Sequence, residues 1–518
     1  MSRNAGECPV WLKRLIQRVS PIVVVLACVG AFRFSLVGRG AMAFLDETMY
    51  YNAALALEKL RTGHVVEAIA HVASNNGRPG NAMLQMVPAA VQAIPFAFGV
   101  SPSNPRALVI PVAANAALSL VTLYLFWRIS LCLFRGDRVA STVAAVMFGL
   151  LVNANLYVRH LLACEPALCV GMLGLWVAVS RPPTRAVAIT VGLLAGFTVT
   201  VYPGYYLFAV ITGFALVGVV PRAGSANRAA RVAAWALGGA MVVLGMEALC
   251  RIGGVSYVAS LRTLSDTISQ GSFDEGWVFV PRYLIQVERY AGVVLLCGLA
   301  AWAGQLLWDL KEGPGVRMVH WLILPATMGW VYQAVASSHL HSTVLYGRLI
   351  HAWMPLMVWA TIDVASRLRR TTWKAIAYAT VLVASVVSWT AYAPGYVGLS
   401  YPIDVLYSLG INTTLLPATQ RHCEMVPSYA YISGGPLDRQ TGFPYSKRND
   451  YSLVNFCMGR PLSSRSTPDP ALARQVLLYQ GAHFLTFRAY GFEGFTAEER
   501  DEVSQPGAYD LRVYAPGP

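Results

Sequence analysis

Long apolar runs separated by short polar turns dominate the first 392 residues. The runs lie near residues 20–38, 106–127, 139–156, 164–179, 186–202, 205–220, 232–250, 291–308, 318–336, 349–365 and 375–392. Most of them approach the roughly 20 residues that a helix needs to cross a bilayer. The pattern therefore predicts an all-α polytopic membrane protein, with about 11 transmembrane helices forming one domain over residues 1–392.

The composition agrees with this class. The chain has 518 residues, of which 56% are hydrophobic and 13% charged, and its mean hydropathy is +0.49. A soluble globular protein carries roughly 25% charged residues. The net charge of +14 could indicate a nucleic-acid partner, but the basic residues are scattered between the apolar runs and form no patch. We therefore expect the protein to lie in a lipid bilayer and to bind no nucleic acid.

Basic residues gather in alternate turns, which predicts the orientation of the chain in the membrane. The turns expected to face the cytoplasm carry Arg128, Arg135, Arg138, Arg181, Arg185, Arg222, Arg228, Arg231, Lys311, Arg317, Arg367, Arg369, Arg370 and Lys374. The first run lacks a small-residue cleavage site, so we expect a retained first helix with a cytoplasmic N-terminus. The remaining loops and the C-terminus are then extracytoplasmic in an inner (plasma) membrane protein.

One apolar segment, residues 81–98, leaves the number of crossings open. If it spanned, every later loop would change sides. Pro88 and Pro95, together with Gln85 and Gln92, favour an interfacial or re-entrant helix instead.

From residue 393 onward no membrane-length run follows, which predicts a small α+β extracytoplasmic domain over residues 393–518. Within it we expect a helix at 470–480 and strands at 483–488 and 509–514. The sequence from Thr496 to Glu499 is typical of a capping box that opens a short helix. Cys423 and Cys457 could form a disulfide in an oxidising compartment or remain two separate thiols.

Acidic and basic residues share the face predicted to be extracytoplasmic. The first outer loop, residues 39–105, holds Asp46, Glu47 and Arg78, and the turn before the fourth run holds Arg159, His160 and Glu165. A later turn ends in Tyr346, Gly347 and Arg348. Carboxylates close to a bilayer are costly to bury, so they indicate binding or catalysis at this face.

These motifs resemble the GT-C glycosyltransferase superfamily, within it the branch of protein O-mannosyltransferases and the lipid A aminoarabinose transferase. Asp46-Glu47 followed by Tyr50 or Tyr51, a helix ending near Leu60, and Gly63 is similar to the start of that family's first outer loop. Residues 76–84 stand where the family has a Lys-Pro-Pro-Leu stretch, although here the sequence is Arg-Pro-Gly-Asn. Residues 159–165 and 346–348 resemble its second outer loop, where an Asp is commoner than Glu165, and its late Tyr-x-Arg element.

The resemblance implies transfer of one sugar from a polyprenyl-phosphate donor to a hydroxyl of a glycan, lipid or protein acceptor. Asp46 is the candidate general base, because a carboxylate that takes the hydroxyl proton accelerates attack on the anomeric carbon. Arg348 and Arg78 are candidates for the lipid phosphate, since guanidinium binds phosphate oxygens bidentately. The other candidate substrate-binding residues are Glu47, Arg159, His160, Glu165 and Tyr346. No nucleotide cofactor is implied, and no Gly-rich phosphate loop is present.

Several of these residues also have a structural interpretation. Asp46 could be a helix N-cap, Glu165 could favour the start of a transmembrane helix, and Arg348 could anchor its helix at the lipid headgroups. His339 and His341 could bind a divalent metal, although two histidines do not make a site.

Two other function classes remain open. A transporter would place ionisable residues near the bilayer midplane, whereas the apolar runs hold few charges and the acids lie near the outer surface. A non-catalytic subunit of glycan assembly with a lectin-like outer domain is the second alternative.

Overall fold

The computed structural model describes most of the chain up to residue 398 and four short strands beyond it. The described residues are 20–37, 53, 56–57, 59–73, 77–97, 109–158, 162–218, 225–269, 276–312, 317–340, 347–398, 430–431, 484–487, 495–498 and 511–516. All structural statements below concern these residues.

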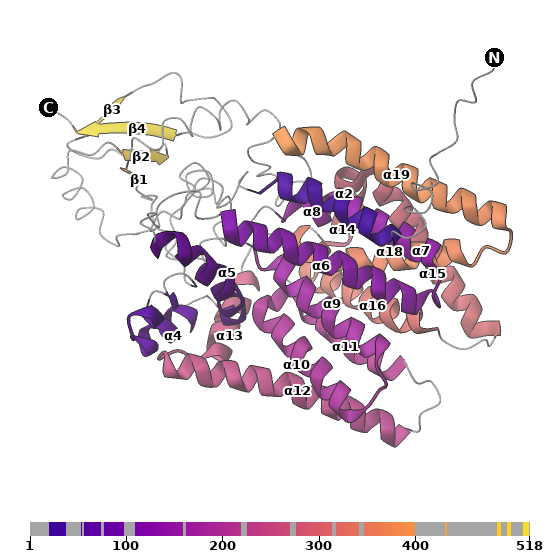
Figure 1. The fold of residues 1–518 in the computed structure, drawn as a ribbon, viewed down its shortest axis with the longest axis horizontal. Helices are drawn as coiled ribbons and strands as arrows, with labels where there is room; N and C mark the ends of the chain where they lie inside the picture. Colours follow the sequence, from indigo (N-terminus) through magenta and orange to yellow (C-terminus); the bar gives the residue numbers. More distant parts are fainter. Residues whose placement is uncertain are drawn as a thin grey trace, which may run out of the picture.

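Every apolar run of the sequence is helical, as Figure 1 shows. The helices that correspond to the runs are α2 (Pro21–Ser35), α6 (Val109–Leu133), α7 (Arg138–Leu150) with α8 (Val152–Leu156), α9 (Cys164–Ser180), α10 (Arg185–Val201), η3 (Pro203–Tyr205) with α11 (Tyr206–Gly218), α12 (Ser225–Ile252), α15 (Arg289–Glu312), α16 (Met318–Ser338), α17 (Gly347–Ile350) with α18 (Met354–Ser366), and α19 (Thr371–Gly398).

Length and hydropathy identify four of the described helices as able to cross a bilayer. These are residues Ile110–Leu133, Asn227–Ile252, Trp277–Lys311 and Thr371–Ala393, and six shorter apolar helices lie beside them. The protein is therefore an integral membrane protein with an α-helical membrane domain. The number of crossings and the orientation remain predictions.

Small residues allow some of these helices to approach closely, as is common in membrane bundles. A Cβ on Gly192 of α10 would lie 2.0 Å from the carbonyl oxygen of Trp235 in α12, and one on Gly238 would lie 2.3 Å from the oxygen of Ile189. Substituting either glycine would push α10 and α12 apart.

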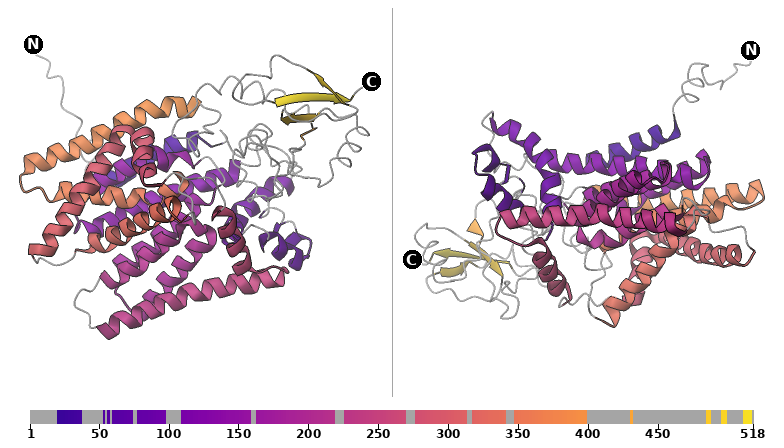
Figure 2. Two further views of the ribbon diagram at one scale, coloured as in Figure 1. Left: turned by 180° about the vertical axis from the view of Figure 1, so that it is seen from behind. Right: turned by 90° about the horizontal axis from the view of Figure 1, so that it is seen from below.

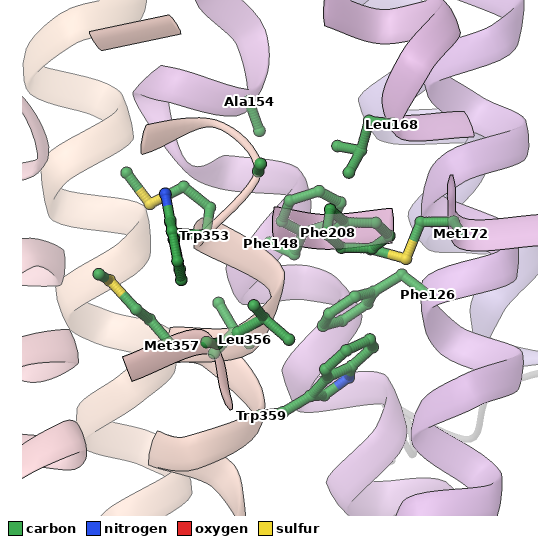
Figure 3. Packing of buried hydrophobic residues seen from close by; sticks show 14 of the residues in the cluster. Phe126, Phe148, Ala154, Leu168, Met172, Phe208, Trp353, Leu356, Met357 and Trp359 are labelled. Carbon is green, nitrogen blue, oxygen red and sulfur yellow. The ribbon is translucent and has the colours of Figure 1, made fainter. Parts of the chain in front are cut away.

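Aromatic rings fill the interior between α6, α7, α9, α11 and α18 (Figure 3). Phe126 stacks on Trp359, with ring centroids 4.9 Å apart and an interplanar angle of 3°. The buried Trp359 Nε1 donates a hydrogen bond to Ser130 Oγ at 2.8 Å. This core fixes α18 against α6.

The predicted first outer loop, residues 39–105, is largely helical where it is described. A helical turn at residues 59–61 ends in a Schellman motif, in which Gly63, at φ +82°, donates to the Leu60 oxygen and His64 donates to the Lys59 oxygen. This confirms a helix that ends near Leu60 and is followed by a glycine. Helix α4 (Val65–Ala73) comes next.

The segment whose crossing was open forms α5 (Pro79–Ala97) and includes both prolines in one helix. It packs on α6 and α10. At its start a Cβ on Gly80 would lie 2.6 Å from the backbone carbon of Thr200, so α5 approaches the end of α10 closely.

The stretch between the apolar runs at 232–250 and 291–308, which the sequence pattern leaves as a loop, is instead mostly helical. It contains α13 (Tyr257–Ser269), α14 (Gly276–Tyr283) and a π-helical turn, η4 (Leu284–Glu288), that leads directly into α15. The π turn follows Pro281, which removes one helical hydrogen bond. The sequence missed this extension because Arg282, Glu288 and Arg289 interrupt the apolar pattern.

Beyond residue 398 four strands form one sheet in the order β1-β2-β4-β3. They are β1 (Ala430–Tyr431), β2 (Phe484–Phe487), β3 (Phe495–Glu498) and β4 (Leu511–Pro516). Strands β2 and β4 overlap the two predicted strands and pair antiparallel, although β4 begins and ends two residues later than predicted. The predicted short helix at Thr496–Glu499 is wrong, because these residues pair with β4 as a strand. The helix at 470–480, Cys423 and Cys457 lie outside the described residues, and the α+β domain as a whole stays a prediction.

Helices α4, α5 and α13 gather at one end of the bundle, and the turn between α18 and α19 lies at the other (Figures 1 and 2). Helix α18 runs along the bundle from one end to the other. We call the end where α9 and α18 begin the Glu165 end, and the end where α15 and α18 finish the Asp309 end.

Candidate functional site

Glu165 lies in the first turn of α9, at the end of the bundle that carries α5. Its side chain is buried, at 2% exposure, and the helix N-cap, Ala163, makes no side-chain cap bond. Glu165 Oε1 is 3.3 Å from His351 Nε2. Within the described residues this oxygen has no hydrogen bond of ordinary geometry. The acid therefore does more than favour the positive end of its helix, because it also faces a side chain from another element.

His351 connects that acid to a tyrosine. It lies between α17 and α18, is 1% exposed, and its Nδ1 is 2.7 Å from the hydroxyl oxygen of Tyr205. The ring of Tyr157 packs edge-on against the imidazole, with centroids 5.9 Å apart. Three segments that are distant in sequence, η3, α9 and the α17–α18 turn, thus meet in a line of polar groups: Tyr205, His351 and Glu165.

Arg348 lies one helical turn before His351, on α17. Its side chain is 6% exposed, so it does not extend to the lipid headgroups, and the interpretation as a surface anchor is wrong. It lies within electrostatic range of Tyr157, whose pKa is raised well above its usual value, mainly by burial. The predicted candidates Glu165 and Arg348 are therefore both brought to this end of the bundle, with His351 and Tyr157 beside them.

Gly347 allows α17 to fit against its neighbours. An added Cβ would lie 2.9 Å from the Tyr157 hydroxyl oxygen and 2.9 Å from Tyr283 Cε2. Any larger residue would displace either a tyrosine or α17 itself. The glycine of the Tyr-Gly-Arg sequence is thus required by packing, next to Arg348.

A buried acid on the π-helical turn supports α17 indirectly. Glu288 accepts hydrogen bonds from the backbone N–H groups of Val152 and Asn153, at 2.8 and 2.7 Å. The side-chain amide of Asn153 then donates through Nδ2 to the Tyr283 hydroxyl at 2.8 Å and to the Gly347 carbonyl oxygen at 3.1 Å. Glu288 therefore caps α8 and, through Asn153, fixes the backbone that carries Arg348.

Arg78, at the start of α5, reaches the same end of the bundle. It is 8% exposed, and its guanidinium carbon lies 5.1 Å from the ring centre of Tyr202, which ends α10. A cation over an aromatic face is stabilised by the ring quadrupole. Tyr202 thus holds a guanidinium group, and Arg78 is fixed where α5 meets α10.

Arg33 is a further buried cation that the sequence reasoning missed. It lies within α2 at 1% exposure, donates to Asn155 Oδ1 at 2.9 Å and to the Ser119 carbonyl oxygen at 3.1 Å, and interacts electrostatically with Glu165. An arginine inside an apolar run is itself the signal, because such residues are costly in a membrane. His351 could have been found in the same way, since it lies in the run 349–365.

The other predicted site residues, Asp46, Glu47, Arg159, His160 and Tyr346, lie outside the described residues. The same is true of His341. His339 ends α16 and accepts a hydrogen bond from Trp277 Nε1 at 3.2 Å. In the described part of the chain no group of three or more His, Cys, Asp and Glu side chains is arranged to hold a metal ion.

The course of the backbone is similar to that of a solved membrane protein. The chain is similar to the crystal structure of ArnT from Cupriavidus metallidurans bound to undecaprenyl phosphate, with a TM-score of 0.51 and 14% sequence identity over 95% of this chain and 97% of that one. ArnT is a GT-C lipid A aminoarabinose transferase. This chain has a GT-C-like fold. The resemblance inferred from the outer-loop motifs is thus confirmed at the level of the fold.

Sequence comparison alone does not reach this result. No protein family model matches the chain, and no curated protein matches it significantly. At 14% identity the likeness concerns the course of the backbone and not the chemistry of particular side chains, which must be argued from the residues of this chain.

Proposed function

We propose that this protein is a membrane glycosyltransferase that moves one sugar from a polyprenyl-phosphate donor to an acceptor hydroxyl at the outer face of the membrane. The observation that carries the proposal is the burial of a carboxylate, Glu165, together with Arg348 and Arg78 at one end of a GT-C-like bundle. The structural neighbour was crystallised with undecaprenyl phosphate, and we extend a lipid phosphate of this class to the donor used here.

In the proposed reaction the acceptor oxygen attacks the anomeric carbon and forms the new glycosidic bond. The bond between that carbon and the phosphate oxygen breaks, and its electron pair leaves with the polyprenyl phosphate. Asp46 takes the proton of the acceptor hydroxyl as general base, a form of help worth roughly 10²–10⁴ in rate. The C-terminal domain faces the same compartment in this proposal.

The leaving phosphate gains negative charge as the bond breaks, so fixed cations stabilise the transition state more than the substrate. Arg348 is assigned to this phosphate, and Arg78 and Arg159 are further candidates. Both described arginines are less than a tenth exposed, and at low local dielectric their attraction for an anion exceeds its value in water. His160, Glu47 and Tyr346 are assigned to substrate binding near them.

Glu165 is assigned to the sugar or to the acceptor, because a carboxylate accepts hydrogen bonds from hydroxyl groups and repels phosphate. We therefore assign two subsites, one for the phosphate at Arg348 and Arg78 and one for hydroxyl groups at Glu165. The identity of the sugar and of the acceptor follows from neither subsite.

The test uses the full-length protein in liposomes with a radiolabelled polyprenyl-phosphate sugar and lipid extracts as acceptor source. We expect transfer by the wild type, a loss of about 10²-fold or more in Asp46→Asn, and a similar loss in Arg348→Met with partial recovery in Arg348→Lys. Glu67→Gln is the matched control. It removes an exposed acid on α4 that pairs with Lys59, and it should retain the full transfer rate.

Two outcomes would contradict the proposal. Equal transfer by Asp46→Asn and wild type would remove Asp46 as the base. Solute flux across the liposome membrane without any sugar transfer would favour the transporter. Transporters carry ionisable residues in their interior, and the buried Arg33 and Glu288 are residues of this kind.

A further inference from the structure

The line of polar groups at the Glu165 end has a defined direction of hydrogen bonding. His351 Nε2 faces a carboxylate oxygen, and a carboxylate can only accept a hydrogen bond. With Glu165 ionised, a bare nitrogen lone pair at 3.3 Å from that oxygen would be repelled, and Nε2 then carries the proton. With the neutral imidazole, Nδ1 is then the acceptor and the Tyr205 hydroxyl is the donor at 2.7 Å.

One tautomer therefore satisfies both contacts of the ring. The alternative, a doubly protonated ring that donates to Tyr205 through Nδ1, also presents Nε2–H to Glu165. In either state the ring presents a hydrogen-bond donor to one chosen oxygen of the carboxylate. His351 therefore constrains the orientation of that carboxylate.

The contact between His351 and Glu165 is looser than a structural ion pair. Charge-assisted N–H···O hydrogen bonds are typically 2.7–2.9 Å long, whereas this one measures 3.3 Å and leaves Oε1 without a hydrogen bond of ordinary geometry among the described residues. A buried acceptor that is incompletely satisfied costs roughly 1–3 kcal/mol.

The position of the ring links the two proposed subsites. His351 lies three residues after Arg348, hence on the same side of a helical turn, and its other face packs against Tyr157, which interacts electrostatically with Arg348. Catalytic hydrogen bonds are often long in unliganded structures and shorten when substrate binds. The loose contact is therefore suited to tighten when a hydroxyl group reaches Glu165.

We propose that the buried chain of polar groups Tyr205–His351–Glu165 positions the Glu165 carboxylate for a substrate hydroxyl, with His351 as the positioning residue and Tyr205 fixing its tautomer. The proposal rests on the proposed function for the identity of the substrate. The contacts among Tyr205, His351 and Glu165 involve only side chains of this protein, so they can be tested without measuring sugar transfer.

The first experiment measures the chain directly. The full-length protein, which has nine histidines, is labelled with ¹⁵N-histidine, reconstituted in lipid bilayers and studied by solid-state NMR. The signal of His351 is assigned by its loss in His351→Gln. We expect a protonated Nε2, and a shift of this signal in both Glu165→Gln and Tyr205→Phe. Tyr206→Phe, which removes the hydroxyl of the neighbouring tyrosine, is the matched control and should leave the signal in place.

The second experiment separates positioning from a purely structural role. In the liposome assay, His351→Leu should lower kcat by about 10²-fold with little change in KM for the lipid donor, because the phosphate ligands are untouched. His351→Gln retains an N–H donor near Nε2 and should recover most of the loss. Tyr205→Phe, which keeps the ring and the packing, should lower kcat by about tenfold, and it covers the case in which His351→Leu fails to fold.

The outcomes distinguish the two proposals. If the His351 signal is unchanged in both Glu165→Gln and Tyr205→Phe, the proposed chain is contradicted. Equal transfer rates for His351→Leu, His351→Gln and the wild type would also contradict it. A wild-type protein that transfers no sugar from any polyprenyl-phosphate donor, but shows the expected NMR shifts, would overturn the proposed function and leave the chain in place.

Discussion

The two ends of the membrane domain both bury titratable side chains, but they hold them differently. At the Asp309 end, Asp309 Oδ1 lies 2.6 Å from the Arg367 guanidinium and its Oδ2 lies 2.9 Å from His320 Nε2. Asp363 lies 2.8 Å from Arg317. At the Glu165 end the buried acid contacts an imidazole at 3.3 Å.

The difference separates a structural cluster from a functional one. Ion pairs between carboxylates and guanidinium groups at the Asp309 end join α15, α16 and α18, and Arg317 and Arg367 are about a quarter exposed, so water screens part of the charge. Such pairs fix helix positions and have little to offer a ligand. At the Glu165 end the buried carboxylate faces the imidazole of His351 at 3.3 Å, and the buried guanidinium group of Arg348 lies on the adjoining α17.

The largest effect expected from this comparison is on the rate of transfer. Glu165→Gln keeps the size of the side chain and removes its charge, so the transfer rate should fall by roughly 10²-fold, equivalent to about 2.7 kcal/mol of transition-state stabilisation. The thermal midpoint in detergent should change little, because the contact to His351 is long. A large fall in the midpoint with an unchanged rate would place Glu165 in the structural class.

The opposite result is expected at the other end. Asp309→Asn leaves His320 and Arg367 without their carboxylate, and breaking a buried ion pair costs roughly 3–5 kcal/mol. Since Arg367 is 27% exposed, we expect about 2 kcal/mol of stability to be lost, measured as a lower denaturation midpoint. The transfer rate per folded molecule should stay near that of the wild type. A selective loss of rate would show that the Asp309 end also serves the reaction.

A backbone substitution at the Glu165 end tests whether geometry matters there as well as charge. Gly347→Ala places a methyl group within 2.9 Å of both Tyr157 and Tyr283, and overpacking of this kind typically costs 1–3 kcal/mol. We expect about 2 kcal/mol of destabilisation together with a higher KM for the lipid donor, because Arg348 follows directly. Unchanged donor affinity would indicate that α17 tolerates a shift without moving its guanidinium group.

The sequence predicted the architecture of these two ends better than their chemistry. Hydrophobic periodicity located every helix that corresponds to an apolar run, because membrane-facing segments must satisfy all backbone hydrogen bonds internally and therefore read as long uniform runs. It failed at residues 276–288, where Pro281 and Glu288 break the pattern although the backbone remains helical. It also failed at Thr496, where a local capping signal was outweighed by pairing with β4.

For the site, the motifs located Glu165, Arg348 and Arg78 at a common end, but not the groups that orient them. His351, Arg33 and Tyr205 lie inside apolar runs and were counted as part of the helices. Contacts between residues as distant as Tyr205 and His351 depend on the packing of three helices, which periodicity does not specify. Charge inside a run was a usable signal, since burying it is costly.

The smallest effect concerns a polar contact that belongs to neither end. Ser130 Oγ in α6 donates to the Phe126 carbonyl oxygen and accepts the Trp359 Nε1–H bond. Ser130→Ala leaves a buried indole N–H unsatisfied, which costs about 1 kcal/mol, and a small decrease in the denaturation midpoint should report it. Both the transfer rate and the His351 NMR signal should be unchanged, because α18 keeps its stacked Phe126–Trp359 contact. A change in either would mean that the core between α6 and α18 transmits strain to His351, and the two ends would then have to be treated as one coupled system.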